Sequence, residues 1–115
     1  MAAGCGGTSR YALEPTRECL QGAEGALVRA APADDFIAAT ATGGAINVKF
    51  ADNQVTITFS EDSDQADNIA TGYRRFKGKG IGIDSALDEV RNVVMVWGVA
   101  PAPAEKAEVH GCLTG

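Results

Sequence analysis

The clearest pattern of hydrophobic and polar positions runs from Ala45 to Ser60, where apolar and polar residues alternate in two short stretches. Alternation of this kind puts every second side chain on the same face of a β-strand, so the pattern predicts two strands that share one apolar face. Asp52-Asn53 separates the stretches, and both residue types tolerate the positive φ of a type I′ turn. We therefore expect a hairpin with a two-residue turn at Asp52-Asn53. The pairs expected across it are Phe50 with Val55, Val48 with Ile57, and Ile46 with Phe59.

The segment after the hairpin has the period of an amphipathic helix. From Ala66 onward, apolar residues recur at i, i+3, i+4, i+7 and i+10. The acidic and hydroxyl side chains of residues 61–64 supply N-cap oxygens and negative charge where a helix begins. The cations within residues 74–77, followed by Gly78, suit the negative end of a helix dipole. The residues expected on the buried face are Ala66, Ile69, Ala70, Tyr73 and Phe76.

Two strands and two terminal helices extend this framework. Val93 to Trp97 is a nearly continuous apolar run, which is typical of a central strand covered on both faces. Ala26 to Ala30 is a shorter candidate strand. Pro15 opens a first helix that runs to Leu20, because proline is favoured in the first turn. Pro103 opens a last helix, and the residues that share one of its faces are Val109, Cys112 and Leu113.

Residues 33–41 admit two interpretations. The first is a short helix that begins near Asp34 or Asp35 and carries Phe36, Ile37, Thr40 and Ala41 on one side. The alternative makes residues 36–42 a further strand, turned at Gly43-Gly44 into the hairpin, with Ile37 opposite Phe50. Residues 78–92, which are Gly-rich and then polar, give no clear prediction.

The order of the predicted elements is strand, helix, strand, strand, helix, strand, which is that of the ferredoxin-like βαββαβ fold. The sequence therefore predicts an α+β domain, with a two-layer antiparallel sheet and an additional helix at each terminus. Residues 1–10 are expected to form a flexible tether, and residues 11–115 a single domain. The terminal helices are expected on the sheet face opposite the two crossover helices, so that Val93 to Trp97 is covered on both sides.

The cysteines Cys5, Cys19 and Cys112 do not have the spacing of a zinc site. Cys19 and Cys112 share a local context, since each precedes a leucine near the end of a terminal helix. In the ferredoxin-like order the first and last strands are antiparallel neighbours, so the two terminal helices emerge from the same edge of the sheet. We therefore expect a Cys19–Cys112 disulfide and an oxidising compartment. The alternative is a pair of buried thiols in a reduced protein.

The first residues suggest an anchor. Ala2-Ala3-Gly4-Cys5 resembles the end of a bacterial lipoprotein cleavage box, in which small residues precede the cysteine that carries the lipid. Cys5 is therefore a candidate lipidation site, and the alternative is a flexible N-terminus with an idle thiol. Residues 1–9 contain neither a charged n-region nor an apolar h-region. A chain that lacks its export signal peptide would explain both the motif and the missing h-region.

Composition narrows the class of protein. A chain of 115 residues with 45% hydrophobic and 22% charged residues is an ordinary globular sequence, which excludes disorder and coiled coil as descriptions of the whole chain. The 10 basic residues against 15 acidic ones give a net charge of −5, which repels phosphate backbones. Nucleic acid is therefore not expected as a partner. The apolar stretch from Val93 to Ala100 is too short for a transmembrane segment.

No motif in the sequence predicts catalysis, a cofactor or a metal. His110 is the single histidine, so no multi-histidine metal site can form, and we interpret it as a solvent-side residue near a helix C-terminus. Asp62, Asp64 and Asp67 approach the spacing of a calcium loop, but alanine occupies a ligand position and N-capping is a sufficient role. Gly78 to Gly82 lacks the G-K-[ST] ending of a phosphate loop and is interpreted as a linker.

Several segments together resemble a group of small exported proteins or lipoproteins of high-GC Gram-positive bacteria that has no assigned activity. The segments are the two Cys-Leu pairs and residues 46–59, 69–76 and 92–97, and the resemblance covers most of residues 11–113. The glycine usual in a turn before Asn92 is absent here. The resemblance implies an envelope location and supplies no site residue.

Our first hypothesis is an exported or cell-envelope domain that binds a protein or a wall component without catalysis, as a monomer or weak dimer. The alternative is a small hydrolase-like enzyme with an unrecognised site. A pocket with converging polar groups would favour the enzyme.

Overall fold

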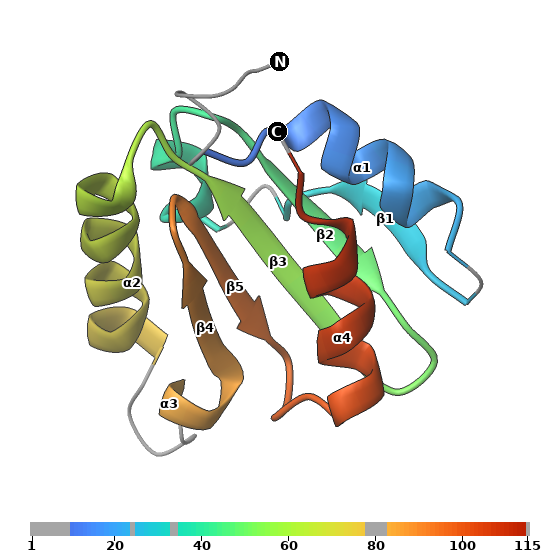
Figure 1. Cartoon of the computed structure of the whole chain (residues 1–115). Coiled ribbons are helices and arrows are strands. Elements are labelled where there is room, and N and C mark those ends of the chain that lie inside the picture. Colours follow the sequence, from blue (N-terminus) through green and yellow to red (C-terminus); the bar gives the residue numbers. More distant parts are fainter. Residues whose placement is uncertain (1–9, 24, 33–34, 78–82, 115) are drawn as a thin grey trace.

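An antiparallel sheet of five strands organises the described part of the chain (Figure 1). The computed structural model describes residues 10–23, 25–32, 35–77 and 83–114, so nearly all of the expected tether of residues 1–10 lies outside the described residues. No helix in these ranges is long and apolar enough to cross a membrane. The elements in chain order are α1 (Leu13–Gln21), β1 (Leu27–Ala30), the 3-10 helix η2 (Ala38–Thr40), β2 (Ala45–Lys49), β3 (Gln54–Phe59), α2 (Ser63–Lys77), α3 (Ile83–Ala86), β4 (Leu87–Val90), β5 (Val93–Trp97) and α4 (Pro103–Cys112).

The α+β class is confirmed, but the ferredoxin-like strand order is not. The sheet runs β1-β2-β3-β5-β4, so β2 and β3 separate the first strand from the last. The reason lies in the connection after β1, whose described part holds the short η2 and no crossover α-helix. β1 therefore returns directly to β2, and β1, β2 and β3 form an antiparallel meander. α2 then crosses from β3 to β4, which lies at the far edge of the sheet.

The strand β4 and its turn lie in the segment for which we made no prediction from the residue pattern. β4 pairs with β5 as an antiparallel hairpin. Arg91, in the turn between them, has a φ of 54°, in the left-handed region that favours glycine. Its guanidinium lies 5.1 Å from the centre of the Tyr11 ring, a cation–π contact that holds the side chain. Arg91 thus adopts the turn conformation for which a glycine was expected. Gly78 to Gly82 lie outside the described residues.

The central hairpin forms with a different register and turn from those predicted. Ile46 pairs with Ile57 and Val48 with Val55, and the N–H of Phe50 donates to the carbonyl of Asn53 at 2.8 Å. The turn is therefore centred on Ala51-Asp52. It is not type I′, because Arg91 is the one non-glycine residue with positive φ among those described.

The side chain of Asn53 explains this shift. Its Oδ1 accepts from the N–H of Val99 at 3.1 Å, and its Nδ2 donates to the carbonyl of Val99 at 3.1 Å. Asn53 therefore anchors the chain that leaves β5 instead of lying within the turn. The shift is two residues, an even number, so every apolar side chain keeps its predicted face.

For the described part of residues 33–41, the helical interpretation is confirmed only in part and the strand interpretation is wrong. Residues 38–40 form a 3-10 turn, and β1 pairs with β2 in the place considered for residues 36–42. Asp35 precedes this turn and also links it to α2. Its Oδ1 accepts from the N–H of Ala38 at 2.9 Å, and its Oδ2 accepts from the Tyr73 hydroxyl at 2.9 Å. Ile37 is buried as a result, whereas Phe36 is 60% exposed.

The two faces of the sheet are covered by different helices. α1 and α4 cross one face, here called the α1–α4 face (Figure 1), where Leu20 and Val109 are buried in one apolar cluster with Ile57. α2 packs against β4 and β5 on the opposite face, here called the α2 face, where Ile69 meets Val94. β5 is therefore a central strand with apolar neighbours on both sides, as predicted.

Candidate binding surface

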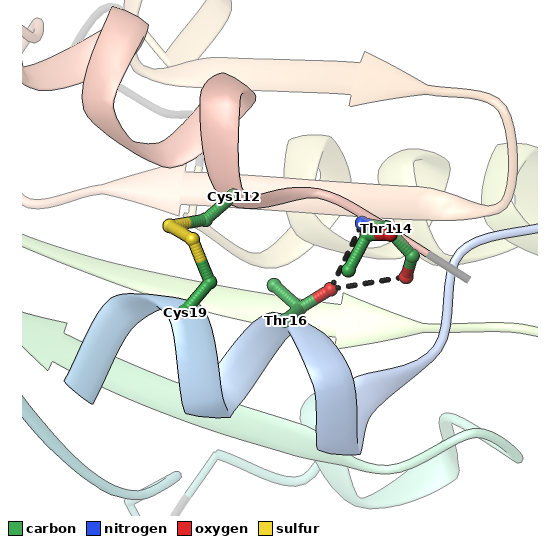
Figure 2. Close-up of a disulfide and its surroundings, with 4 residues drawn as sticks. All are labelled: Thr16, Cys19, Cys112 and Thr114. Atoms are coloured by element: carbon green, nitrogen blue, oxygen red, sulfur yellow. Dashed lines mark hydrogen bonds between the residues drawn. A yellow bond between two sulfur atoms is a disulfide. The ribbon is translucent and has the colours of Figure 1, made fainter. Parts of the chain in front are cut away.

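The two ends of the described chain are tied together on the α1–α4 face (Figure 2). α1 and α4 lie side by side and bring Cys19 and Cys112 to disulfide distance, with their Cα atoms 5.4 Å apart. Beside them, the buried hydroxyl of Thr16 donates to the carbonyl of Thr114 at 3.3 Å and accepts from its N–H at 3.2 Å. The predicted cysteine pair is in place, but the neighbouring strands that led to it are not. The helices meet because both cover the same face.

Asn92 links the N-terminal segment to the sheet. Its side chain is 2% exposed. Its Nδ2 donates to the carbonyls of Tyr11 and Ser60 at 2.9 and 2.8 Å, and its Oδ1 accepts from the N–H of Tyr11 at 2.8 Å. These contacts hold the start of the described chain against the ends of β3 and β4.

Helices cover only part of the α2 face. α2 lies over β4 and β5, and no described α-helix packs on this face over β1 and β2. The strand register places mostly polar side chains there, in two rows that cross the strands. One row is Arg29, Asn47 and Thr56, and the next is Leu27, Lys49 and Gln54.

A hydrogen-bonded network fixes Arg29 on this open region. Asn47 is 1% exposed, and its Nδ2 donates to the Thr56 hydroxyl at 3.1 Å. Its Oδ1 accepts from Nε of Arg29 at 2.9 Å, while Nη2 of Arg29 donates to Oε1 of Gln54 at 3.2 Å. Asn47 is thereby satisfied despite its burial. The guanidinium is held in one orientation, and the structure gives its Nη1 no acceptor among the described residues.

The Arg29 side chain lines a recess of about 430 Å³ at the tip of the β2–β3 hairpin. Lys49 and Gln54 contribute from the hairpin, and Gly98 and Val99 from the chain after β5. The carboxylate of Asp52 belongs to the same lining. We call this region the Arg29 recess. It combines two cations with apolar surface, since Val99 is 61% exposed.

A second recess, of about 320 Å³, lies between α2 and the segment before η2. Phe36 and Ile37 form its apolar side, and Gln65 and Asn68 present amides from α2. Its described lining contains no charged side chain, so it lacks the groups that would orient an ion.

The single histidine lies in a cluster of charged groups on the α1–α4 face. Nε2 of His110 is 2.5 Å from Oδ2 of Asp88, and Nζ of Lys106 is 3.7 Å from the same oxygen. His110 is half-exposed, in agreement with its interpretation as a solvent-side residue. Asp88 was not predicted as its partner because β4 itself was not predicted. The cluster joins α4 to the edge strand.

A pair of carboxyl groups bridges α2 and β4 on the α2 face. Partial burial raises the pKa of Glu89 to about 7 from its usual 4.5, and the hydrogen bond and negative charge of Asp67 act in the same direction. The positive charge of Arg74 opposes this shift. Glu89 therefore keeps its proton to a higher pH than an ordinary glutamate does. Burial, together with the neighbouring Asp35, likewise raises the pKa of Tyr73 far above its usual value.

Among the described residues, no three His, Cys, Asp or Glu side chains are grouped to hold a metal ion. Asp62, which was considered for a calcium loop, instead caps α2. Its Oδ1 accepts from the N–H of Gln65 at 2.9 Å.

The structure brings together Cys19 and Cys112, while Cys5 lies outside the described residues. Sequence reasoning missed the Arg29 recess, whose only signal was the polar position of Asn47 within the hairpin alternation.

Comparison of the chain with protein-family models, curated proteins and solved structures finds no match.

Proposed function

We propose that this protein is an exported domain of the cell envelope that binds a protein or wall component without catalysis. The observation that carries this proposal is the Cys19–Cys112 pair at disulfide distance, which joins residues 93 positions apart. Disulfides persist in oxidising compartments and are rare where thiols are kept reduced. An envelope location also agrees with the resemblance to small exported proteins.

Binding ranks above catalysis because of how the polar groups are arranged. The Arg29 recess offers oriented donors on an open surface. The acid–base pair of His110 and Asp88 instead lies with Lys106 where α4 crosses the edge strand, and links those two elements. A domain of this design holds a rigid surface toward a partner. We propose that it acts as a monomer or weak dimer.

A lipid on Cys5 would hold the domain at the membrane surface through the part of the expected tether that lies between Cys5 and the domain. The sequence around Cys5 supports this part of the proposal. Since a single anchored cysteine leaves Cys19 and Cys112 free to pair, the odd number of cysteines is accounted for.

The test is a fusion of the whole gene, with its native upstream sequence, to a phosphatase reporter that is active only outside the cytoplasm. We expect an active reporter in the membrane fraction, and Cys5→Ala should move it to the medium. An inactive, cytoplasmic fusion would contradict the proposed location. Retention of the Cys5→Ala fusion at the membrane would contradict the lipid anchor alone.

A further inference from the structure

We infer that the Arg29 recess binds the carboxylate of a peptide, with Arg29 and Lys49 contacting it directly. The inference deepens the proposed binding function and rests on it for the biological role. It names the surface, the contacting groups and the class of ligand.

The orientation of Arg29 is the first argument. Its Nε and one Nη2 donor are used by Asn47 and Gln54, at 2.9 and 3.2 Å. These bonds fix the plane of the guanidinium over the sheet and leave the Nη1 end for a ligand. A planar guanidinium with parallel N–H groups matches a carboxylate, and a side chain already fixed in place loses little entropy on binding.

Neighbouring donors converge on the same region. Lys49 is one row away from Arg29 on the same sheet face, is exposed, and has no acceptor among the described residues. Gln54 uses its Oε1 to accept from Arg29, so its amide N–H groups remain available. In a chain of net charge −5, two adjacent cations form a local site for an anion.

Two features favour a peptide as the carrier of this anion. Leu27 and Val99 flank the cations and are 60% and 61% exposed, which provides apolar contact for a side chain beside the carboxylate. β1 also ends the strand order, so its outer edge has no strand partner in the described chain. An extended peptide pairs with such an edge through its backbone.

Titration of the ¹⁵N-labelled protein with N-acetyl-alanyl-leucine, followed by amide chemical shifts, tests the inference. We expect shifts at residues 27–29, 49–54 and 98–99. The C-terminal amide of the same peptide should not bind. N-acetyl-aspartyl-leucinamide, which carries only a side-chain carboxylate, tells whether a terminal or a side-chain group is preferred, and binding of either supports the inference.

Four charge variants separate binding from structure. Arg29→Gln should weaken binding about tenfold or more because the charged fork is lost. Lys49→Gln, which breaks no hydrogen bond among the described residues, should weaken it about threefold, and Asp52→Asn should tighten it about twofold by removing repulsion. Arg75→Gln makes the same change of net charge on the exposed side of α2 and should leave affinity unchanged.

Three results would overturn the inference. The first is an absence of shifts in the recess at peptide concentrations of tens of millimolar. The second is equal weakening by Arg75→Gln and Arg29→Gln, and the third is inorganic phosphate binding as tightly as the peptide. Because the titration uses purified protein, failure of peptide binding is distinguishable from failure of the export test.

Discussion

Asp35, Asn47 and Asn92 are buried polar side chains that join distant segments of the chain. Asp35 connects the segment before β2 to α2 through Tyr73, and Asn92 connects the N-terminal segment to β3. Each carries hydrogen bonds that offset the cost of its burial. Truncation of such a side chain leaves its partners buried without hydrogen bonds. The free energy of unfolding therefore falls by more than the hydrogen bonds themselves contribute.

Asn92→Ala is expected to lower the free energy of unfolding by about 2 to 3 kcal/mol, since backbone groups of Tyr11 and Ser60 lose their partner. Urea unfolding measures this change. Asn68→Ala, at an exposed position of α2, is the control and should change stability by less than about 0.5 kcal/mol. Equal effects of the two substitutions would contradict the role given to Asn92.

Glu89 makes stability depend on pH. Its pKa is about 7 in the folded protein against a usual 4.5, so between these values the folded state holds a proton that the unfolded state has released. Stability therefore falls as pH rises from about 4.5 to about 7. Glu89→Gln should remove this fall in stability. As the pH rises, the variant should become more stable than the parent protein, by no more than about 1 kcal/mol because the Glu89–Asp67 pair is partly exposed.

Unfolding of both proteins between pH 4.5 and pH 8 measures the effect. Glu61→Gln, an exposed change of the same kind, should leave the slope as in the parent. A Glu89→Gln variant whose stability follows the parent at every pH would show that Glu89 ionises in the same way in the folded and unfolded states.

Residue patterns alone could locate the core positions but not those of the Arg29 recess. Tyr73 and Trp97 are buried as the helical period and the apolar run indicate. The partners of Arg29, by contrast, come from two other strands, and only the pairing of β1 with β2 brings Arg29 beside Asn47. A contact between strands that depends on register is not visible in a local pattern.

At the scale of elements, two glycines should respond in opposite ways to alanine. A Cβ on Gly72 would lie 3.6 Å from the Ile37 side chain, an ordinary contact, whereas one on Gly43 would lie 2.7 Å from the Phe59 carbonyl oxygen. Gly72→Ala should therefore stabilise α2 by about 0.5 to 1 kcal/mol, because alanine is the better helix former.

Gly43→Ala should destabilise the protein by about 2 kcal/mol or more, because the backbone of β3 cannot easily move away from the added Cβ. Thermal unfolding of both variants tests the pair. Loss of stability in Gly72→Ala would mean that α2 and the segment around Ile37 are packed more tightly than described.

The hairpin shows how far a pattern determines an element. Alternation predicted which side chains share one face of the sheet, and that prediction is confirmed because an even shift preserves the face. The turn was misplaced by one residue because Asn53, a good turn residue, is used to hold Val99. Turn propensity is weak compared with such a tertiary contact.

The cysteine pair should contribute strongly to stability. Closing a loop across 93 positions restricts the unfolded chain and is worth about 4 to 5 kcal/mol in the chain-entropy description. Urea unfolding with and without reductant measures this. The variant with Cys19→Ala and Cys112→Ala should match the reduced protein, and Cys5→Ser should match the oxidised one. Insensitivity to reductant would contradict the pairing.

For the whole molecule, the sequence predicted the class and the covering layers but not the strand order. The error in strand order came from the crossover helix expected within residues 33–41, because the described part of that connection holds only η2. β4 was missed as well, since Leu87-Asp88-Glu89-Val90 mixes apolar ends with acidic positions and lacks a strand pattern. The two terminal helices nevertheless meet, because packing on one face needs no particular strand order.

The central claim is that the domain works in an oxidising compartment with its ends joined through Cys19 and Cys112. Peptide mass spectrometry of protein isolated from its native cells, with free thiols blocked at lysis and no reductant added, tests it most directly. We predict one linked peptide containing both cysteines and no blocked thiol at either position. Recovery of Cys19 and Cys112 as separate, blocked thiols would contradict the claim.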